Sequence, residues 1–255
     1  MQEENIFEKI KEYRNKDYKS NNTTHWFEKE IELVKNSGNK FKVNGFGICA
    51  NDKFEKDEKG TFRYYLEFEI INPKGKKGDL VSIMMNPSDK TNPKNKKIDS
   101  TVTNVLRMAY VSEYSKVIIL NSFPYINGNG NYSAKNLETY SNENKINRNF
   151  IKNFLKENID KQDILLAWGG NVKNTIADYY DILKPYEEYN KIYVYNITSQ
   201  KFPMHPSPFN QDKVNEILRN EKKLQKVSLV KKRQKIVVIA NKNEVLASFC
   251  CKCGL

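Results

Sequence analysis

Four short apolar runs, each ending in polar or glycine residues, constrain the fold of this chain more than any other feature. The runs are DLVSIMMN at 79–86, KVIILNS at 116–122, DILLAWG at 163–169 and KIYVYNIT at 191–198. Segments of helical length separate them, at about 98–111, 142–159 and 171–186. Apolar runs that alternate with helices are typical of a parallel sheet covered on both faces. The pattern therefore predicts an α/β fold: a three-layer α/β/α domain with a central, mainly parallel four-stranded sheet.

The residues at or just beyond the ends of these runs predict where a site would lie. They are Asn86-Pro87-Ser88, Asn121-Ser122, Trp168-Gly169-Gly170 and, after the last run, His205-Pro206-Ser207-Pro208. In open α/β sheets, ligands bind in the crevice beyond the carboxyl ends of the strands. We therefore expect polar groups from four strands to meet at one rim.

The sequence before the first run predicts two further parts. Residues 1–40 read as an N-terminal helical extension with polar helices at about 4–19 and 24–36, and His25 is expected on a face of the second helix. FKVNGFGICA and TFRYYLEFEII then alternate apolar and polar residues around a charged turn. This alternation predicts an antiparallel hairpin over 41–72, which leads into the main domain.

The main domain is expected to cover residues 41–226. Its last helix, at about 211–226, follows Asn210 as N-cap. Residues 227–255 form a basic segment that contains LVKKRQK, the apolar run IVVIAN and three cysteines. These cysteines are Cys250, Cys251 and Cys253. Their stretch, FCCKCGL, lacks the paired C-x-x-C spacing of structural zinc sites, so reduced thiols are favoured over a bound metal.

Charge indicates the class of partner. Lys and Arg outnumber Asp and Glu by 43 to 31, and the resulting formal charge of +12 is spread along the chain. This favours a polyanionic partner, with nucleic acid first and an acidic membrane second, although an AT-rich genome also raises the lysine content. The start, MQEENIFEKIKEYR, has no apolar core of a signal peptide, and no apolar run of about 18 residues could span a bilayer. We expect a cytoplasmic protein.

Absent motifs narrow the chemistry. The sequence has no Walker loop, no G-x-G-x-x-G, no H-E-x-x-H and no G-x-S-x-G. The chain has 2 histidines and places one of them on the rim, which argues against a multi-histidine metal centre. Amide, hydroxyl, carboxylate and one imidazole remain, so we expect neither a cofactor nor a metal.

The rim motifs carry a resemblance to a known superfamily. MMNPS after one strand, LNS and AWG at the ends of two others, and HPSP after the last resemble the ordered motifs of the uracil-DNA glycosylase superfamily. More closely, residues 60–210 resemble the DUF1643 family of bacteria and phages, whose function is unknown, with its strand-NPS motif, downstream Asp, strand-N motif, AWG strand and terminal HP motif. The resemblance implies a three-layer α/β/α domain that flips a nucleotide out of DNA and cleaves its N-glycosidic bond.

Three residues take catalytic roles under this resemblance. Cleavage builds negative charge on the departing base, and His205, on a turn stiffened by prolines, suits the donor that stabilises this charge. The alternative is a histidine merely hydrogen-bonded in a loop. Asn86 matches the position that orients the attacking water. Asp99 in KKIDSTV is the carboxylate for a general base or, with Ser100, simply the N-cap of the following helix.

Four residues are expected to meet the base. Asn121 matches the amide that reads the pyrimidine edge, and this amide can face uracil or, flipped, cytosine. Phe123 or Tyr125 could stack on the ring or could equally belong to the core. Superfamily members strict for uracil carry a bulky aromatic residue where Ser88 stands. The small Ser88 therefore predicts space for 5-substituted pyrimidines, including a base that carries a sugar.

The turn after the last run and the loop after Asn86 are expected to contact DNA. Phe209 lies where the superfamily inserts an apolar wedge into the duplex; packing at a helix start is the alternative. Ser207 of HPSP is assigned to the same contact. Lysines of the loop would bind phosphates. They are Lys90, Lys94, Lys96 and Lys97.

The leading hypothesis is a monofunctional DNA glycosylase. It would remove uracil or a 5-substituted or glucosylated hydroxymethylcytosine and leave an abasic site, and defence against phages with such cytosines is a specific version. No lysine occupies a motif position, so no Schiff-base lyase step is expected. We expect a monomer that binds duplex or single-stranded DNA and no membrane. The alternatives are a non-catalytic module that binds nucleotides or modified DNA, and an N-hydrolase of free nucleosides or nucleotides.

Overall fold

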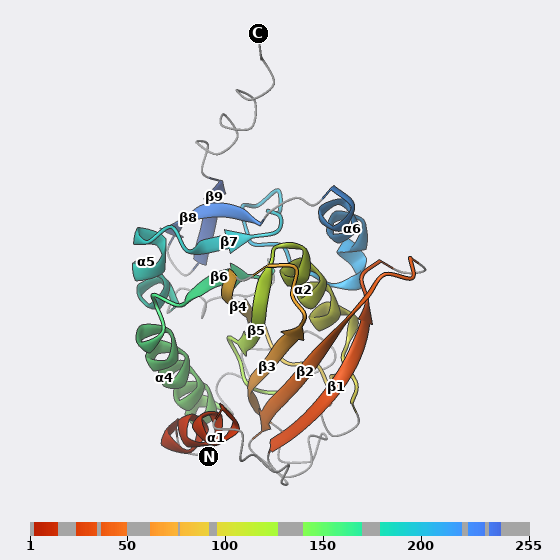
Figure 1. Cartoon of the computed structure of the whole chain (residues 1–255). Helices are drawn as coiled ribbons and strands as arrows, with labels where there is room; N and C mark the ends of the chain where they lie inside the picture. Colours follow the sequence, from red (N-terminus) through yellow and green to blue (C-terminus); the bar gives the residue numbers. More distant parts are fainter. Residues whose placement is uncertain are drawn as a thin grey trace.

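The computed structural model shows one mixed sheet with helices around it (Figure 1). The described residues are 3–14, 24–34, 37–49, 62–75, 77–91, 96–126, 140–169, 179–220, 224–232 and 235–240. The strands are β1 (Thr24–Glu32), β2 (Lys40–Cys49), β3 (Arg63–Ile71), β4 (Lys77–Met84), β5 (Tyr114–Asn121), β6 (Gln162–Leu166), β7 (Ile192–Val194), β8 (Gln225–Lys232) and β9 (Lys235–Ala240). The helices are α1 (Glu3–Arg14), α2 (Ser100–Val111), α4 (Ser141–Glu157), α5 (Tyr180–Glu188), α6 (Gln211–Asn220) and the short 3-10 helix η3 (Pro208–Asn210).

The prediction of a central, mainly parallel four-stranded sheet is wrong. The described residues form nine strands in the order β1-β2-β3-β5-β4-β6-β7-β8-β9. The four apolar runs are the strands that pair in parallel, as β5-β4-β6-β7, but the remaining pairings are all antiparallel. The β2–β3 hairpin joins the edge of β5, and the β8–β9 hairpin joins the edge of β7. Apolar runs indicate buried strands, but they do not indicate which hairpins extend the sheet on either side.

The helix predicted at about 24–36 is also wrong, because residues 24–32 form strand β1. Phe27 and Ile31 are buried among residues 27–32, whose side chains are described, and a spacing of four places two side chains on one face of a helix and equally on one face of a strand. Pairing with β2 over the whole strand, from Thr24 opposite Ile48 to Glu32 opposite Lys40, selects the strand. His25 therefore lies in a strand.

Most other predicted elements are confirmed, with changes at their ends. The hairpin over 41–72 is β2 and β3, and α2 and α4 lie within two residues of their predicted bounds. The helix predicted at 211–226 ends at Asn220, and strand β8 follows. Helix α5 is described from Tyr180, whereas 170–178 lie outside the described residues.

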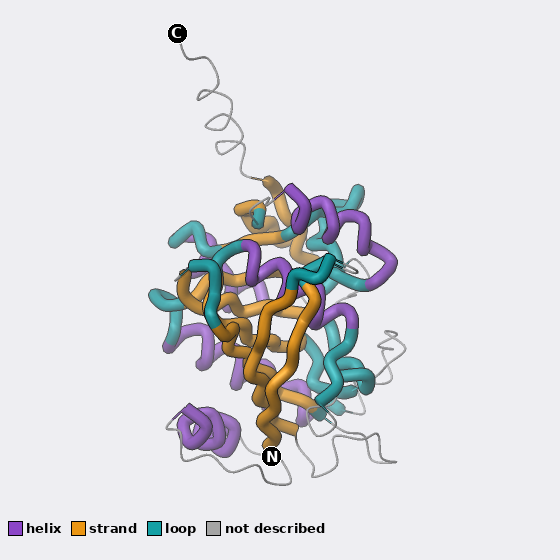
Figure 2. Tube along the Cα trace, turned by 45° about the vertical axis from the view of Figure 1, so that its right-hand side comes forward, coloured by secondary structure: helices purple, strands orange, loops and turns teal. Residues whose placement is uncertain are grey.

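Two hydrophobic clusters cover the two faces of the sheet. Val81 and Ile83 of β4 belong to the cluster that includes α1, α4 and α5, and Leu80 belongs to the cluster that includes α2 and α6. This alternation follows from the two-residue period of a strand. Helix α1 lies against α4, where Phe7 and Phe150 meet edge-on with ring centroids 5.1 Å apart. Figure 2 shows the helices outside the strands on both sides.

Two further expectations concern membrane spans and cysteines. None of the described helices is long and apolar enough to cross a bilayer. Cys250, Cys251 and Cys253 lie outside the described residues. Cys49 is a buried free thiol whose pKa is raised by burial.

Candidate functional site

The carboxyl ends of β4 and β5 lie side by side and bring two of the predicted motifs together. Met84 pairs with Asn121 across the two strands. The backbone amides of Ser122 and Phe123 donate to the carbonyls of Met84 and Met85, at 2.8 and 2.9 Å. These bonds hold the start of the NPS turn against the LNS end of the neighbouring strand.

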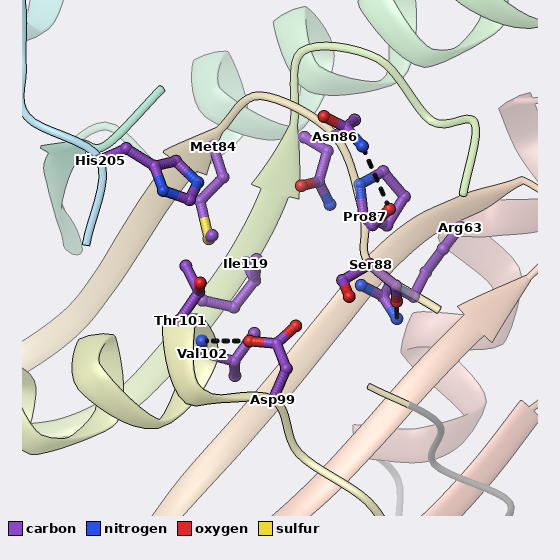
Figure 3. A pocket seen from close by; sticks show the side chains of 11 residues that line it. Arg63, Met84, Asn86, Pro87, Ser88, Asp99, Thr101, Val102, Ile119 and His205 are labelled. Atoms are coloured by element: carbon purple, nitrogen blue, oxygen red, sulfur yellow. Dashed lines mark hydrogen bonds between the residues drawn. The ribbon is translucent and has the colours of Figure 1, made fainter. Parts of the chain in front are cut away.

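A pocket of about 50 Å³ lies at this end of the sheet. Its walls come from the start of β3, the chain from the end of β4 to the first turn of α2, β5, and the turn after β7. The lining residues are Arg63, Met84, Asn86, Pro87, Ser88, Asp99, Thr101, Val102, Ile119, Asn121 and His205. Five of them are predicted site residues: Asn86, Ser88, Asp99, Asn121 and His205. All but Asn121 are labelled in Figure 3. The structure thus brings together the residues that were assigned to catalysis and three of the motifs that were assigned to the rim.

The backbone of His205 is fixed by hydrogen bonds to its own carbonyl. The Tyr195 hydroxyl donates to it at 2.8 Å, the Asn210 side-chain amide at 2.7 Å, and the Ser207 backbone amide at 2.8 Å. Asn104, from α2, donates to the carbonyl of Pro206 at 3.0 Å. Asn210 therefore ties this turn together and precedes helix α6.

The imidazole of His205 projects into the pocket (Figure 3) and makes no hydrogen bond with a described residue. Burial lowers its pKa, and the negative charge of Asp99 opposes this effect only in part. A neutral imidazole carries one N–H donor and one acceptor nitrogen. The ring can therefore donate to a ligand at neutral pH.

A glycine shapes the space behind this histidine. Gly169, of the AWG strand end, has φ of +81°, and a Cβ added there would lie 3.1 Å from the Cβ of His205. A side chain at this position would be both strained and crowded. Gly169 therefore allows the β6 end to approach the histidine turn closely.

Asp99 caps helix α2. Its Oδ1 accepts from the Val102 backbone amide at 2.8 Å, and its Oδ2 accepts from the Thr91 hydroxyl at 2.8 Å. The capping interpretation is thus confirmed, and the carboxylate lies in the pocket wall at the same time. Each carboxylate oxygen can accept more than one hydrogen bond, so Asp99 retains capacity toward a ligand.

The two asparagines of the pocket differ in their surroundings. Asn86 is half-buried, and its Nδ2 lies 3.3 Å from the carbonyl of Pro87, to which it donates. Asn121 is buried, and its side-chain amide makes no hydrogen bond within the described part of the chain. The backbone carbonyl of Asn121 accepts from Asn147 at 2.8 Å, which fixes the strand end. An amide held in this way is available to a ligand.

Sequence reasoning missed Arg63. This residue opens β3, is 2% exposed and lines the pocket. Its Nη1 donates to the carbonyls of Thr91 at 2.7 Å and Ser88 at 3.3 Å, and burial lowers its pKa. The signal was an arginine among aromatic residues in TFRYYLEF, within a segment already expected to be a strand of the hairpin.

Phe123 and Tyr125 do not line the pocket. Phe123 is buried in a hydrophobic cluster. Tyr125 stacks on Tyr140 with ring centroids 4.6 Å apart, and Phe62 lies against both rings. The structure thus places both rings among other apolar and aromatic side chains, as the alternative to stacking on a base had it.

The described residues that were expected to contact DNA are exposed or half-buried. Phe209 is 99% exposed in η3, four residues after His205, and Ser207 is half-buried in the same turn. Lys90, Lys96 and Lys97 are exposed. Lys94 lies outside the described residues. No group of three or more potential metal-ligating side chains occurs in the described ranges.

Comparison with protein families adds a match that covers this pocket. The family described as "Protein of unknown function (DUF1643)" matches residues 63–207. The chain belongs to the DUF1643 family. The matched part contains every residue that lines the pocket, from Arg63 to His205. This match confirms the closer of the two resemblances; it assigns no activity and does not include the uracil-DNA glycosylase superfamily.

Other comparisons contribute little. No curated protein matches the sequence. A candidate acetyl xylan esterase from Bacteroides fragilis NCTC 9343, known from a crystal structure, is 10% identical with a TM-score of 0.25, over 79% of this chain and 56% of that one. This chain thus spans little more than half of that protein's length, and so low a TM-score supports no inference about fold or activity.

Proposed function

We propose that this DUF1643 protein is a monofunctional DNA glycosylase that removes a modified pyrimidine and leaves an abasic site. The observation that supports the proposal is the meeting of His205, Asn86 and Asn121, from separate strand ends, in one pocket. The imidazole of His205, the amides of Asn86 and Asn121, and the Asp99 carboxylate in the same pocket are the groups that such a reaction needs. A narrower form of this proposal is the excision of hydroxymethylated or glucosylated cytosines from phage DNA. The small Ser88 in the pocket wall supports it.

The proposed reaction breaks the bond between sugar C1′ and the base nitrogen. The bonding electron pair leaves with the base, and the N–H of neutral His205 stabilises the negative charge at a base oxygen. Asn121 binds the edge of the base with its amide. Water, oriented by Asn86, adds its oxygen to C1′ and passes its proton to the Asp99 carboxylate. The base anion then takes a proton from solvent, and Asp99 releases the proton that it accepted, so the products are the free base and an abasic sugar.

Access to a base in DNA requires that the nucleotide leave the duplex. Phe209 is fully exposed on the turn that carries His205. An apolar side chain held in water at this place suits a wedge that replaces the flipped base in the stack. Exposed Lys90, Lys96 and Lys97 on the loop after the NPS motif suit contacts with phosphates.

A second candidate is a module that binds modified DNA without cleaving it. Two observations favour it: position 86 is an amide, and both oxygens of Asp99 already accept hydrogen bonds at the start of α2. An amide is no general base, and the Asp99 carboxylate already serves as the cap of helix α2. The pocket would then recognise a flipped base and leave its bond intact.

One substrate panel separates the two candidates. Purified protein is incubated with oligonucleotides that contain uracil, 5-hydroxymethylcytosine or its glucosylated form, and alkali then breaks the strand at abasic sites. Breakage on at least one substrate is expected. Tight binding to the modified DNA, with no breakage of any substrate, would instead establish the binding module.

A variant pair tests whether DNA is the substrate. Phe209→Ala should reduce excision from duplex DNA about tenfold and leave single-stranded substrates nearly unaffected, because only a duplex needs the wedge. The control is Tyr189→Ala, which removes another exposed aromatic side chain, 60% exposed, at the end of α5. Equal activity of both variants on duplex DNA, together with cleavage of free nucleosides, would favour a nucleoside hydrolase.

A further inference from the structure

Arg63 is a buried cation that forms no ion pair with any described residue. The residue is 2% exposed, and no ion pair involves it in the described part of the chain. Asp99 and Asp89 influence it only through space. Its Nε has no hydrogen-bond partner. A buried charge that is neither paired nor fully hydrogen-bonded destabilises a fold, and such groups are concentrated at functional sites.

A bracing role accounts for only part of this arginine. Nη1 alone makes the two hydrogen bonds, to the carbonyls of Ser88 and Thr91, and these hold the loop between β4 and α2. Arginine offers five N–H donors in a planar fork, and the remaining donors have no described acceptor. The side chain therefore retains donors at the pocket that it lines.

The position of Arg63 in the pocket indicates what these donors would meet. Arg63 and Ser88 form one side of the pocket, and His205 lies on the other side (Figure 3). In a pyrimidine, C2 and C5 are opposite each other across the ring, and the oxygen on C2 is the one nearest to the glycosidic nitrogen. If His205 donates to that oxygen, the group on C5 points toward Ser88 and Arg63.

We infer that Arg63 is the residue that selects the substituent on C5 of the base, and that this substituent carries acceptor oxygens. Hydroxymethyl, glucosyl and carboxyl groups share this chemistry, and alkyl groups lack it. Ser88 leaves the space, and Arg63 supplies the donors. The inference rests on the proposed function, because it needs a flipped pyrimidine with His205 at its C2 oxygen.

The test compares substituents of equal size. Wild-type protein is given DNA that contains 5-ethylcytosine or 5-hydroxymethylcytosine, which differ by a methyl group in place of a hydroxyl, and binding is measured by fluorescence anisotropy and excision under single turnover. We expect a preference of about tenfold or more for the hydroxyl, the size usual for a hydrogen bond to a charged group. Glucosylated and 5-carboxyl substrates then identify the source of the oxygen: a gain for the carboxyl substrate alone indicates an anion, and a gain for the glucosylated substrate indicates a sugar.

Arg63→Met should abolish the preference for the hydroxymethyl over the ethyl substrate. Arg63→Lys keeps the positive charge, so it should retain part of the preference for the 5-carboxyl substrate. Arg107→Met is the control, because Arg107 is another arginine, itself partly buried, that donates to the Glu32 carbonyl at 2.7 Å and does not line the pocket. An equal loss on all substrates in Arg63→Met would reduce Arg63 to a loop brace and overturn the inference. If this variant does not fold, the wild-type comparison decides alone, and the absence of any preference overturns the inference.

The two proposals fail in different ways. Preferential binding of the hydroxymethyl substrate without any cleavage, lost in Arg63→Met, supports the role of Arg63 and rejects the glycosylase. Cleavage that is equal for ethyl and hydroxymethyl substrates supports the glycosylase and rejects the role of Arg63.

Discussion

The two ends of the parallel strands hold polar clusters of opposite character. At the amino ends, Lys77 donates to the Tyr114 hydroxyl at 2.7 Å, and this hydroxyl donates to the Asp163 carboxylate at 2.6 Å. Lys77 also lies 3.4 Å from the same carboxylate. At the carboxyl ends, the imidazole of His205 and the amide of Asn121 have no hydrogen-bond partner among the described residues.

This difference separates structural polar groups from functional ones. A closed network joins β4, β5 and β6 at their starts and supplies every member with a partner, which stabilises the fold. The pocket leaves donors and acceptors without partners, which costs stability unless a ligand completes them. Changes at the amino ends should therefore alter unfolding, and changes at the carboxyl ends should alter activity.

The largest effect is expected at His205. His205→Ala should lower the single-turnover excision rate by about 10²–10³-fold, because it removes the donor to the departing base. The fold should persist, since the turn is held through the carbonyl of residue 205 and not through the ring. Binding of substrate DNA by anisotropy should change far less. Met204→Ala truncates a neighbour outside the pocket and serves as control; equal losses of binding and rate would remove His205 from catalysis.

A smaller effect is expected from crowding the histidine. Gly169→Ala should lower the excision rate about tenfold, because the new Cβ would lie 3.1 Å from the Cβ of His205 and displace the ring. Gly38→Ala is a matched control: Gly38 also has positive φ, +72°, but nothing lies within 4 Å of its added Cβ. Both variants should lose similar unfolding free energy from backbone strain. If both also lose the same activity, the contact with His205 has no functional role.

At the closed cluster the expected change is in stability. Tyr114→Phe should lower the free energy of unfolding by about 1–2 kcal/mol, because Lys77 and Asp163 lose the hydroxyl between them. The excision rate of the folded protein should not change. Tyr189→Phe, at an exposed tyrosine, controls for the substitution in urea denaturation. A loss of rate at unchanged stability would contradict the assignment of this cluster to the fold.

Local pattern predicted the strands and the pocket residues better than it predicted the sheet. Asn86, Asn121 and His205 were found because each follows a buried run, and the ends of adjacent parallel strands must meet. Asp99 was recognised with its capping alternative because a cap has a local signature. These inferences need only the neighbouring sequence.

Features that depend on distant pairing were missed. The β2–β3 hairpin was predicted, but its pairing to β5 through Leu66 and Ile119 has no signature in either segment. Strand β1 was taken for a helix because a spacing of four suits both structures. Arg63 was overlooked because its place in the pocket depends on where the β2–β3 hairpin pairs with β5, and the local sequence does not show this pairing.

The smallest expected effect distinguishes the two ends by pH. Burial lowers the pKa of His205 below its value near 6.5 in the unfolded chain, so the unfolded state binds more protons between these two pKa values. Stability in that window must rise with pH and fall on acidification. We expect the free energy of unfolding, measured in urea at pH 7.5 and 5.5, to decrease more for wild type than for His205→Ala.

All carboxylates and the second histidine are common to both proteins, so the difference reports His205 alone. Tyr114→Phe should keep the wild-type decrease, because burial raises the pKa of Tyr114 far from this window. An equal decrease in wild type and His205→Ala would show that the imidazole is not held in a desolvated pocket.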